Sequence, residues 1–174
     1  MVTLVLTAIG DDRPGLVSAL AGVIARHGGS WDRSQMARLG GKFAGIVLVA
    51  VPADAVAAVE TDLRALAADG VLDVRVEHDR GVVAADGLRW SLELVGTDRP
   101  GIVHEITVAL AAHGVSIDEL ETATRDAPMS GGMLFEARAE LVAPATVAVD
   151  ELRAVLERLA DELMVDLTLS TADP

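Results

Sequence analysis

The 174-residue sequence contains no cysteine, and this absence removes several classes of protein. Without cysteine there is no disulfide framework, no thiolate nucleophile and no cysteine-ligated metal. Basic residues are also few: 14 Lys and Arg stand against 27 Asp and Glu, which gives a formal net charge of −13. Since no local cluster of Lys or Arg offsets this charge, direct binding to nucleic acid or to an anionic membrane is not expected.

The sequence also lacks long apolar segments. Its longest aliphatic run, Ala44 to Val51, ends at Pro52 and falls far short of the ~20 residues that a membrane helix needs. The apolar stretch at the start of the chain has no basic segment before it and stops at Gly10, so no secretory signal is visible. A cytoplasmic location is the resulting expectation.

Hydrophobic residues make up 51% of the chain and charged residues 24%, a composition that is typical of globular proteins and excludes intrinsic disorder. The sequence also contains an internal repeat. The segment IGDDRPGLV (9–17) returns as VGTDRPGIV (95–103), and ARHGGSWD (25–32) returns as AAHGVSID (111–118), both at an offset of 86 residues (95 minus 9). We therefore expect two copies of one unit, at residues 1–79 and 88–172, joined by a short linker at 80–87.

Hydrophobic periodicity predicts the order βαββαβ in each copy. The expected strands lie at 2–9, 30–39, 43–51 and 72–77, then at 90–95, 115–124, 133–142 and 165–170, and the expected helices at 16–27, 56–66, 102–113 and 149–163. Split βαβ units of this kind form a four-stranded antiparallel sheet with both helices on one face. The fold class is therefore α+β, with two ferredoxin-like sandwiches. The central hairpin loop of the second copy, at 126–132, is longer than that of the first.

The Asp-Arg-Pro-Gly turn of each copy lies where the first strand leads into the first helix. Backbone N–H groups at a helix start attract anions, and Gly15 and Gly101 let a ligand approach the main chain closely. Asp12 and Asp98 can accept hydrogen bonds from an ammonium group, so the turn suits a zwitterion such as an amino acid. The alternative is a plain helix start with an Asp cap and a proline in the first turn, which needs no ligand.

Other polar residues give weaker signals. Ser30 and Ser116 begin the second strand of each copy, where we expect them beside the turn and able to offer a hydroxyl to the same ligand. The expected role of His27 and His113, at the ends of the first helices, is structural. No metal-binding spacing, phosphate loop, nucleophile elbow or zinc-helix motif is present, so we expect no metal, no cofactor and no catalysis.

The pattern Gly-x-Asp-Arg-Pro-Gly-[Leu/Ile]-Val, followed by a helix, Ala-x-His-Gly and a β-hairpin, resembles the ACT domain in both copies. The resemblance covers residues 1–79 and 88–172. Two ACT units with nothing else resemble the family of the glycine cleavage system transcriptional repressor type. In that family an ACT pair regulates a partner protein in response to an amino acid and does not bind DNA by itself.

The resemblance also implies where an effector binds, namely where two ACT units meet, at the turn after the first strand and at the start of the second strand. Amino-acid-binding members often have Asn at the positions of Asp12, Asp98, Ser30 and Ser116. The positions carried over are Asp12, Arg13, Pro14, Gly15 and Leu16 with Ser30, and Asp98, Arg99, Pro100, Gly101 and Ile102 with Ser116.

These observations lead to the expectation of a non-catalytic regulatory protein that binds a small amino acid, glycine or serine, and signals to a partner protein, with the chain forming a homodimer. The rival interpretation is a ligand-free interaction module, because many ACT units serve only in pairing. A tandem ACT pair also resembles the amino-terminal half of some phosphoserine phosphatases, but the Asp-x-Asp-containing domain of those enzymes is absent from this sequence.

The two copies differ in the predicted polarity of their sheets. In the second copy, polar side chains alternate with apolar ones along the central strands, whereas the first copy is apolar in both phases there, as with Val5 and Ile9 against Leu4 and Leu6. Helices cover only one face of such a sheet. We therefore expect a second copy of the protein or a binding partner to bury the open face of the first unit. The alternative is that small residues dilute the patch enough for it to be tolerated: Thr3, Thr7, Ala44 and Ala50.

Overall fold

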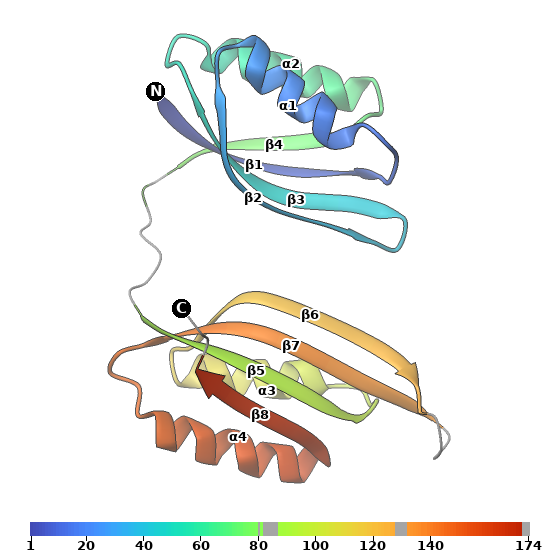
Figure 1. Cartoon of the computed structure of the whole chain (residues 1–174), viewed down its shortest axis with the longest axis vertical. Helices are drawn as coiled ribbons and strands as arrows, with labels where there is room; N and C mark the ends of the chain where they lie inside the picture. The colour runs from blue at the N-terminus through green and yellow to red at the C-terminus, as the bar shows by residue number, and fades with distance from the viewer. Residues whose placement is uncertain (80, 82–86, 128–131, 172–174) are drawn as a thin grey trace. The chain divides into compact units, whose positions relative to one another are not determined.

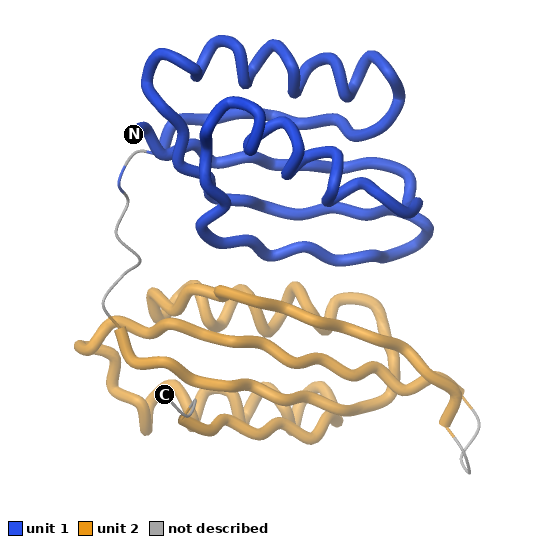
Figure 2. Tube along the Cα trace, turned by 45° about the horizontal axis from the view of Figure 1, so that its top comes forward, with its two compact units in different colours: residues 1–82 blue, residues 83–174 orange. Residues whose placement is uncertain are grey.

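The computed structural model describes residues 1–79, 81, 87–127 and 132–171. The chain divides into two compact units, Met1–Val82 and Val83–Pro174, drawn in different colours in Figure 2. Most of the expected linker and of the longer hairpin loop at 126–132 lies outside the described residues. Each unit is considered by itself below.

The first unit is a four-stranded antiparallel sheet in the order β2-β3-β1-β4, with both helices on one face (Figure 1). The predicted element order is confirmed. Its elements are β1 (Val2–Asp11), α1 (Leu16–Arg26), β2 (Ser30–Leu39), β3 (Lys42–Val51), α2 (Val56–Ala68) and β4 (Asp73–His78).

The second unit repeats this architecture, with the sheet order β6-β7-β5-β8 and its two helices again on one face (Figure 1). Its elements are β5 (Gly87–Thr97), α3 (Ile102–Ala112), β6 (Ser116–Asp126), β7 (Met133–Pro144), α4 (Val149–Leu163) and β8 (Val165–Thr171). Two ferredoxin-like α+β sandwiches are thus present. None of the helices in the described ranges is long and apolar enough to cross a membrane.

Each unit has its own hydrophobic core between the sheet and the helices. In α1 the apolar positions at i, i+4, i+7 and i+8 are all buried, and they pack with alternate residues of the central strands. The same arrangement holds α4 onto its sheet through Leu152, Leu156 and Leu163. Burying a side chain of this size contributes roughly 1.5–3 kcal/mol, so these stripes position both helices.

The faces of the two sheets that turn away from the helices differ, as the sequence predicts. In the first unit this open face carries Val5 and Leu48 in its middle, with Ile9 and Ile46 49% and 51% exposed. The corresponding surface of the second unit carries the cross-strand pair Glu93 and Arg138, together with other charged side chains: Glu119, Glu121, Glu136 and Glu140. The difference in polarity is confirmed, and the burial of the apolar face stays a prediction.

Candidate functional site

The turn between β1 and α1 brings four of the predicted site residues together at one end of the first sheet: Asp12, Arg13, Pro14 and Gly15. Gly15 takes the left-handed conformation, with φ 97° and ψ −4°, and is the N-cap residue of α1. Gly101 has φ 97° and ψ −11° and caps α3 in the same way. The repeat in sequence is therefore also a repeat in backbone geometry, and glycine is required because other residues rarely adopt this φ.

The alternative of an Asp-capped helix start is wrong. The cap residue is the glycine in both units, and no side chain makes a capping hydrogen bond to α1 or α3. Pro14 and Pro100 precede the cap residues and so lie before the first turn of the helix. The first N–H groups of both helices thus have no side-chain acceptor at the cap, which leaves them as donors for a bound anion.

Long-range contacts hold the first turn in place. The Asp12 N–H donates to the Gly41 carbonyl at 2.9 Å, and the Arg13 guanidinium donates to the Gly70 carbonyl at 2.8 Å. Gly10 lies so close to the α2–β4 connection that an added Cβ would be 2.9 Å from the Val71 carbonyl oxygen. The turn is therefore fixed by its neighbours before any ligand arrives.

Two carboxylates of the first turn have cationic partners. The Asp12 carboxylate lies 3.3 Å from the Arg38 guanidinium. Asp11 accepts a hydrogen bond from Lys42, and that bond and the charge of the lysine lower the pKa of this exposed carboxyl. A ligand ammonium at Asp12 would have to compete with Arg38.

The second turn has a feature that the first does not share. The Arg99 guanidinium lies 3.2 Å from the carboxylate of Glu105, in the first turn of α3, and another Glu105 oxygen lies 3.1 Å from the point where a Cβ on Gly101 would be. The carboxylate of the chain itself thus lies over the glycine at the helix start. Beside it is an open pocket of about 410 Å³, lined in part by Asp98, Arg99, His104 and Phe135.

At the matching position of the first unit, 86 residues earlier, stands Ala19. The two positions are structurally equivalent, because the N–H of Ala19 donates to the Gly15 carbonyl at 2.8 Å and that of Glu105 to the Gly101 carbonyl at 2.9 Å. A Cβ on Gly15 would have no heavy atom within 4 Å, so the first helix start is open. Sequence reasoning missed Glu105, although an acidic residue in the first turn of only one copy was a visible signal.

The structure contradicts the expected position of the two serines beside the turns. Ser30 pairs with Ala50, which pairs with Thr3 on β1, whereas the turn follows Asp11, eight positions further along the same strand (11 minus 3). At about 3.3 Å per residue this is roughly 26 Å. Ser116 is likewise paired with Val142 at the far end of its sheet. The reason is that the helix carries the chain back before the second strand begins.

Two further predicted site residues, Leu16 and Ile102, have side chains that are buried away from the turn surface. The side chains of Leu16 and Ile102 are 3% and 2% exposed and belong to the cores. A ligand at the turn would meet their N–H groups and no side-chain atom. The side chains of the turn residues Asp12 and Pro14 are exposed.

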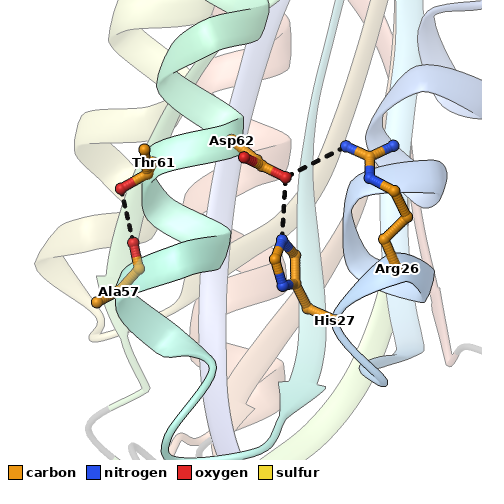
Figure 3. A network of polar contacts seen from close by, with 5 residues as sticks. All are labelled: Arg26, His27, Ala57, Thr61 and Asp62. Carbon is orange, nitrogen blue, oxygen red and sulfur yellow. Dashed lines mark hydrogen bonds and ion pairs between the residues drawn. The ribbon is translucent and has the colours of Figure 1, made fainter.

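His27 and His113 are the C-cap residues of α1 and α3. His27 Nε2 contacts the Asp62 carboxylate at 3.0 Å, and Arg26 donates to the same oxygen at 3.3 Å, which ties α1 to α2 (Figure 3). The hydrogen bond with His27, followed by that with Arg26, lowers the pKa of Asp62. His113 instead contacts the Ala109 carbonyl of its own helix at 2.9 Å. Across the residues with described positions, no group of three or more His, Asp and Glu is arranged to hold a metal ion.

Both units match the model of the ACT domain, at residues 2–77 and 92–170. The chain therefore belongs to the ACT domain family and contains two such domains in tandem. It is 25% identical over 164 residues to the glycine cleavage system transcriptional repressor of Escherichia coli (strain K12), which covers 92% of this chain and 85% of that protein.

Solved structures agree with this assignment. The crystal structure of an unknown protein from Galdieria sulphuraria has a TM-score of 0.88 and 31% sequence identity and covers 99% of both chains. That of a candidate glycine cleavage system transcriptional repressor has a TM-score of 0.73 at 18% identity, covering 99% of this chain and 98% of the other. The second likeness shows the fold alone.

Proposed function

We propose that this tandem-ACT chain is a non-catalytic regulatory protein that senses a small amino acid, glycine or serine, and signals to a partner protein. The observation that carries the proposal is the open start of α1 behind the left-handed Gly15, beside the exposed Asp12. The start of α3 repeats this backbone geometry with the Glu105 carboxylate over Gly101. The similarity to a glycine cleavage system transcriptional repressor supports a role in transcriptional regulation of amino-acid metabolism.

The charged groups of an amino acid each have a complementary partner at the first turn. The ligand carboxylate accepts hydrogen bonds from the N–H groups at the start of α1, where the helix dipole favours negative charge. Its ammonium group takes the Asp12 carboxylate in place of Arg38. Glycine and serine fit because they are small enough to approach the main chain at Gly15, where an added Cβ would have no heavy atom within 4 Å.

A complete site requires two ACT domains. The turn and Ser30 lie at opposite ends of one sheet, so a ligand that contacts both must be held by two domains, in one chain or in two. Such a ligand favours the arrangement that brings the two half-sites together, by as much as its affinities for the two arrangements differ. The arrangement is then read by a partner protein in the cytoplasm, since a net charge of −13 disfavours direct contact with DNA. The chain acts as a homodimer in this proposal.

The experiment is a thermal-shift and calorimetric screen of the full chain against the twenty amino acids. A ligand at 100 times its dissociation constant raises the free energy of unfolding by ~2.7 kcal/mol, so glycine or serine is expected to give a clear shift. Asp12→Ala is expected to remove the part of that shift that comes from the first turn, and Asp11→Ala, at the neighbouring exposed carboxylate, to leave the shift unchanged. Gly15 and Gly101 are unsuitable for substitution, because their φ of 97° strains any other residue.

A second candidate is the ligand-free interaction module, which the apolar open face of the first sheet favours. A screen in which none of the twenty amino acids shifts the unfolding temperature would support this candidate and refute amino-acid sensing.

A further inference from the structure

The apolar open face of the first unit is bordered by charged side chains on both edge strands. On this face the paired residues of β2 are Ser30, Arg33, Gln35 and Ala37, with Asp32 in the bulge before Arg33, and β4 contributes Asp73, Arg75 and Glu77, with a net charge of −1. Between them β3 and β1 contribute small and apolar side chains: Ala44, Ile46, Leu48, Ala50, Thr3, Val5, Thr7 and Ile9. We call this surface the unit-1 sheet face.

The charges lie in register with the apolar centre. Arg33 pairs with Leu48 on β3, Leu48 pairs with Val5 on β1, and Val5 pairs with Glu77 on β4. One row across the sheet therefore reads basic, apolar, apolar, acidic. Arg75 Nε lies 3.0 Å from the Glu77 carboxylate, so the glutamate already has one partner on its own strand, and both side chains are more than half exposed.

We propose that the unit-1 sheet face binds the same face of a second copy of this chain, around a two-fold axis parallel to the strands. Such an axis exchanges the β2 edge and the β4 edge of the sheet. Each row of paired residues then faces the same row of the second copy. It places β2 over β4 of the second copy and β3 over β1, so Arg33 faces Glu77 of the other protomer twice. Leu48 then packs on Val5, and the opposed Arg33 and Glu77 carry complementary charges.

The other face-to-face two-fold axis is disfavoured by the same charges. An axis perpendicular to the strands would place β4 over β4 and bring two net-acidic rims together, with β2 over β2 on the other side. Like charges opposed across an interface weaken association and select against that register. The charge pattern therefore selects one of the two possible isologous dimers.

The size of the face agrees with a stable dimer. Four strands at about 4.8 Å spacing and ten residues of β1 at about 3.3 Å each give a flat footprint of roughly 600 Å². Interdigitating side chains bring the surface buried per partner towards the ~800 Å² of an ordinary specific interface. Sheets that pack face to face cross at about 30°, an offset that the long side chains of Arg33 and Glu77 can span.

The test is sedimentation equilibrium of the full chain and of charge-reversed variants, with circular dichroism to confirm that each is folded. The wild type is expected to be a dimer. Arg33→Glu and Glu77→Arg should each raise its dissociation constant at least tenfold, because each creates two like-charged contacts. The double variant R33E/E77R restores the opposition and should return the dissociation constant to near the wild-type value. Glu119→Arg, at the position of the second unit that matches Arg33, should have no effect.

Three results would overturn the proposal: a wild-type monomer, single reversals that leave the dimer unchanged, and a double variant that is weaker than both singles. The inference specifies the dimer of the proposed function. Amino-acid binding is measured separately by calorimetry, so a failed dimer interface and a failed sensing function give different results.

Discussion

Exchanging Glu105 and Ala19 between the two units tests whether a built-in carboxylate separates a closed turn from an open one. The variants are Glu105→Ala, which gives the second unit the residue of the first, and Ala19→Glu, which does the reverse. Because Glu105 lies over Gly101 and next to Arg99, its carboxylate occupies the place that a ligand carboxylate would take. A ligand at the second turn must first displace it.

The magnitude follows from the exposure and the position of Glu105. A negative charge in the first turn of a helix contributes about 0.3–1 kcal/mol, and an ion pair as exposed as this one adds about 0.2–1 kcal/mol after solvent screening. A central value of about 1 kcal/mol corresponds to about fivefold in affinity. Glu105→Ala should thus strengthen amino-acid binding at the second turn about fivefold, and Ala19→Glu should weaken it at the first by a similar factor.

Calorimetric titration with glycine or serine measures the affinities, and thermal unfolding measures the stability. Glu105→Ala should lower the unfolding temperature of its domain by about 4–8 °C. The control is Glu151→Ala, which removes an acidic side chain from the first turn of α4, at the end of the second sheet opposite the β5–α3 turn. It should lose similar stability and leave binding unchanged. If Glu105→Ala changed neither binding nor stability, the carboxylate would have no role at this helix start.

Two other perturbations test the packing and the charge network. Gly96→Ala should destabilise the second unit by about 1–3 kcal/mol in urea unfolding, because its Cβ would lie 2.3 Å from Val165 Cγ1 and 3.0 Å from Val165 Cα. Gly22→Ala, within α1 and with no neighbour nearer than 3.7 Å, should instead stabilise the first unit by about 0.5–1 kcal/mol. The contact with His27 lowers the pKa of Asp62 below its ordinary 3.8. The ionised Asp62 carboxylate therefore stabilises the fold above pH 3.8, and this stabilisation is lost as the pH falls through the lowered pKa. Urea unfolding from pH 6 to pH 3 should therefore show a shallower loss of stability for Asp62→Asn than for the wild type, and equal slopes would contradict this.

Local patterns predicted most of the fold because the core-facing positions recur with the period of each element. The helix at 149–163 and the strand at 30–39 were predicted with the bounds that the structure has. Apolar residues at helical spacing mark the helix, and glycines on both sides mark the strand. The close packing at Gly10 and Gly96 depends instead on the segments that pack against them, because backbone and Val165 atoms lie within 3 Å of an added Cβ.

The candidate site was predicted less well, because it depends on where the chain goes between the elements. Ser30 was expected beside the first turn, but α1 has 11 residues and at 1.5 Å per residue returns the chain by roughly 16 Å before β2 begins. The contacts of Arg99 with Glu105 and of His27 with Asp62 join partly exposed side chains that no periodic pattern marks. Such pairs become visible only when the elements are packed.

Differences between the two units separate the positions that build the turn from those that give each unit its own properties. Gly15 and Gly101 both have φ 97°. The N–H groups of Asp12 and Asp98 both donate a backbone hydrogen bond to the neighbouring strand region, at Gly41 and Met133. These features are shared because the helix start depends on them. The side chain over that glycine changes from Ala19 to Glu105, and the open sheet face changes from apolar to charged. Both changes lie on surfaces that a ligand or a second chain would meet, and neither alters the core. Two domains with one fold therefore present different surfaces. The first has an open turn and an apolar sheet face, and the second has a turn covered by its own Glu105 carboxylate and a charged sheet face.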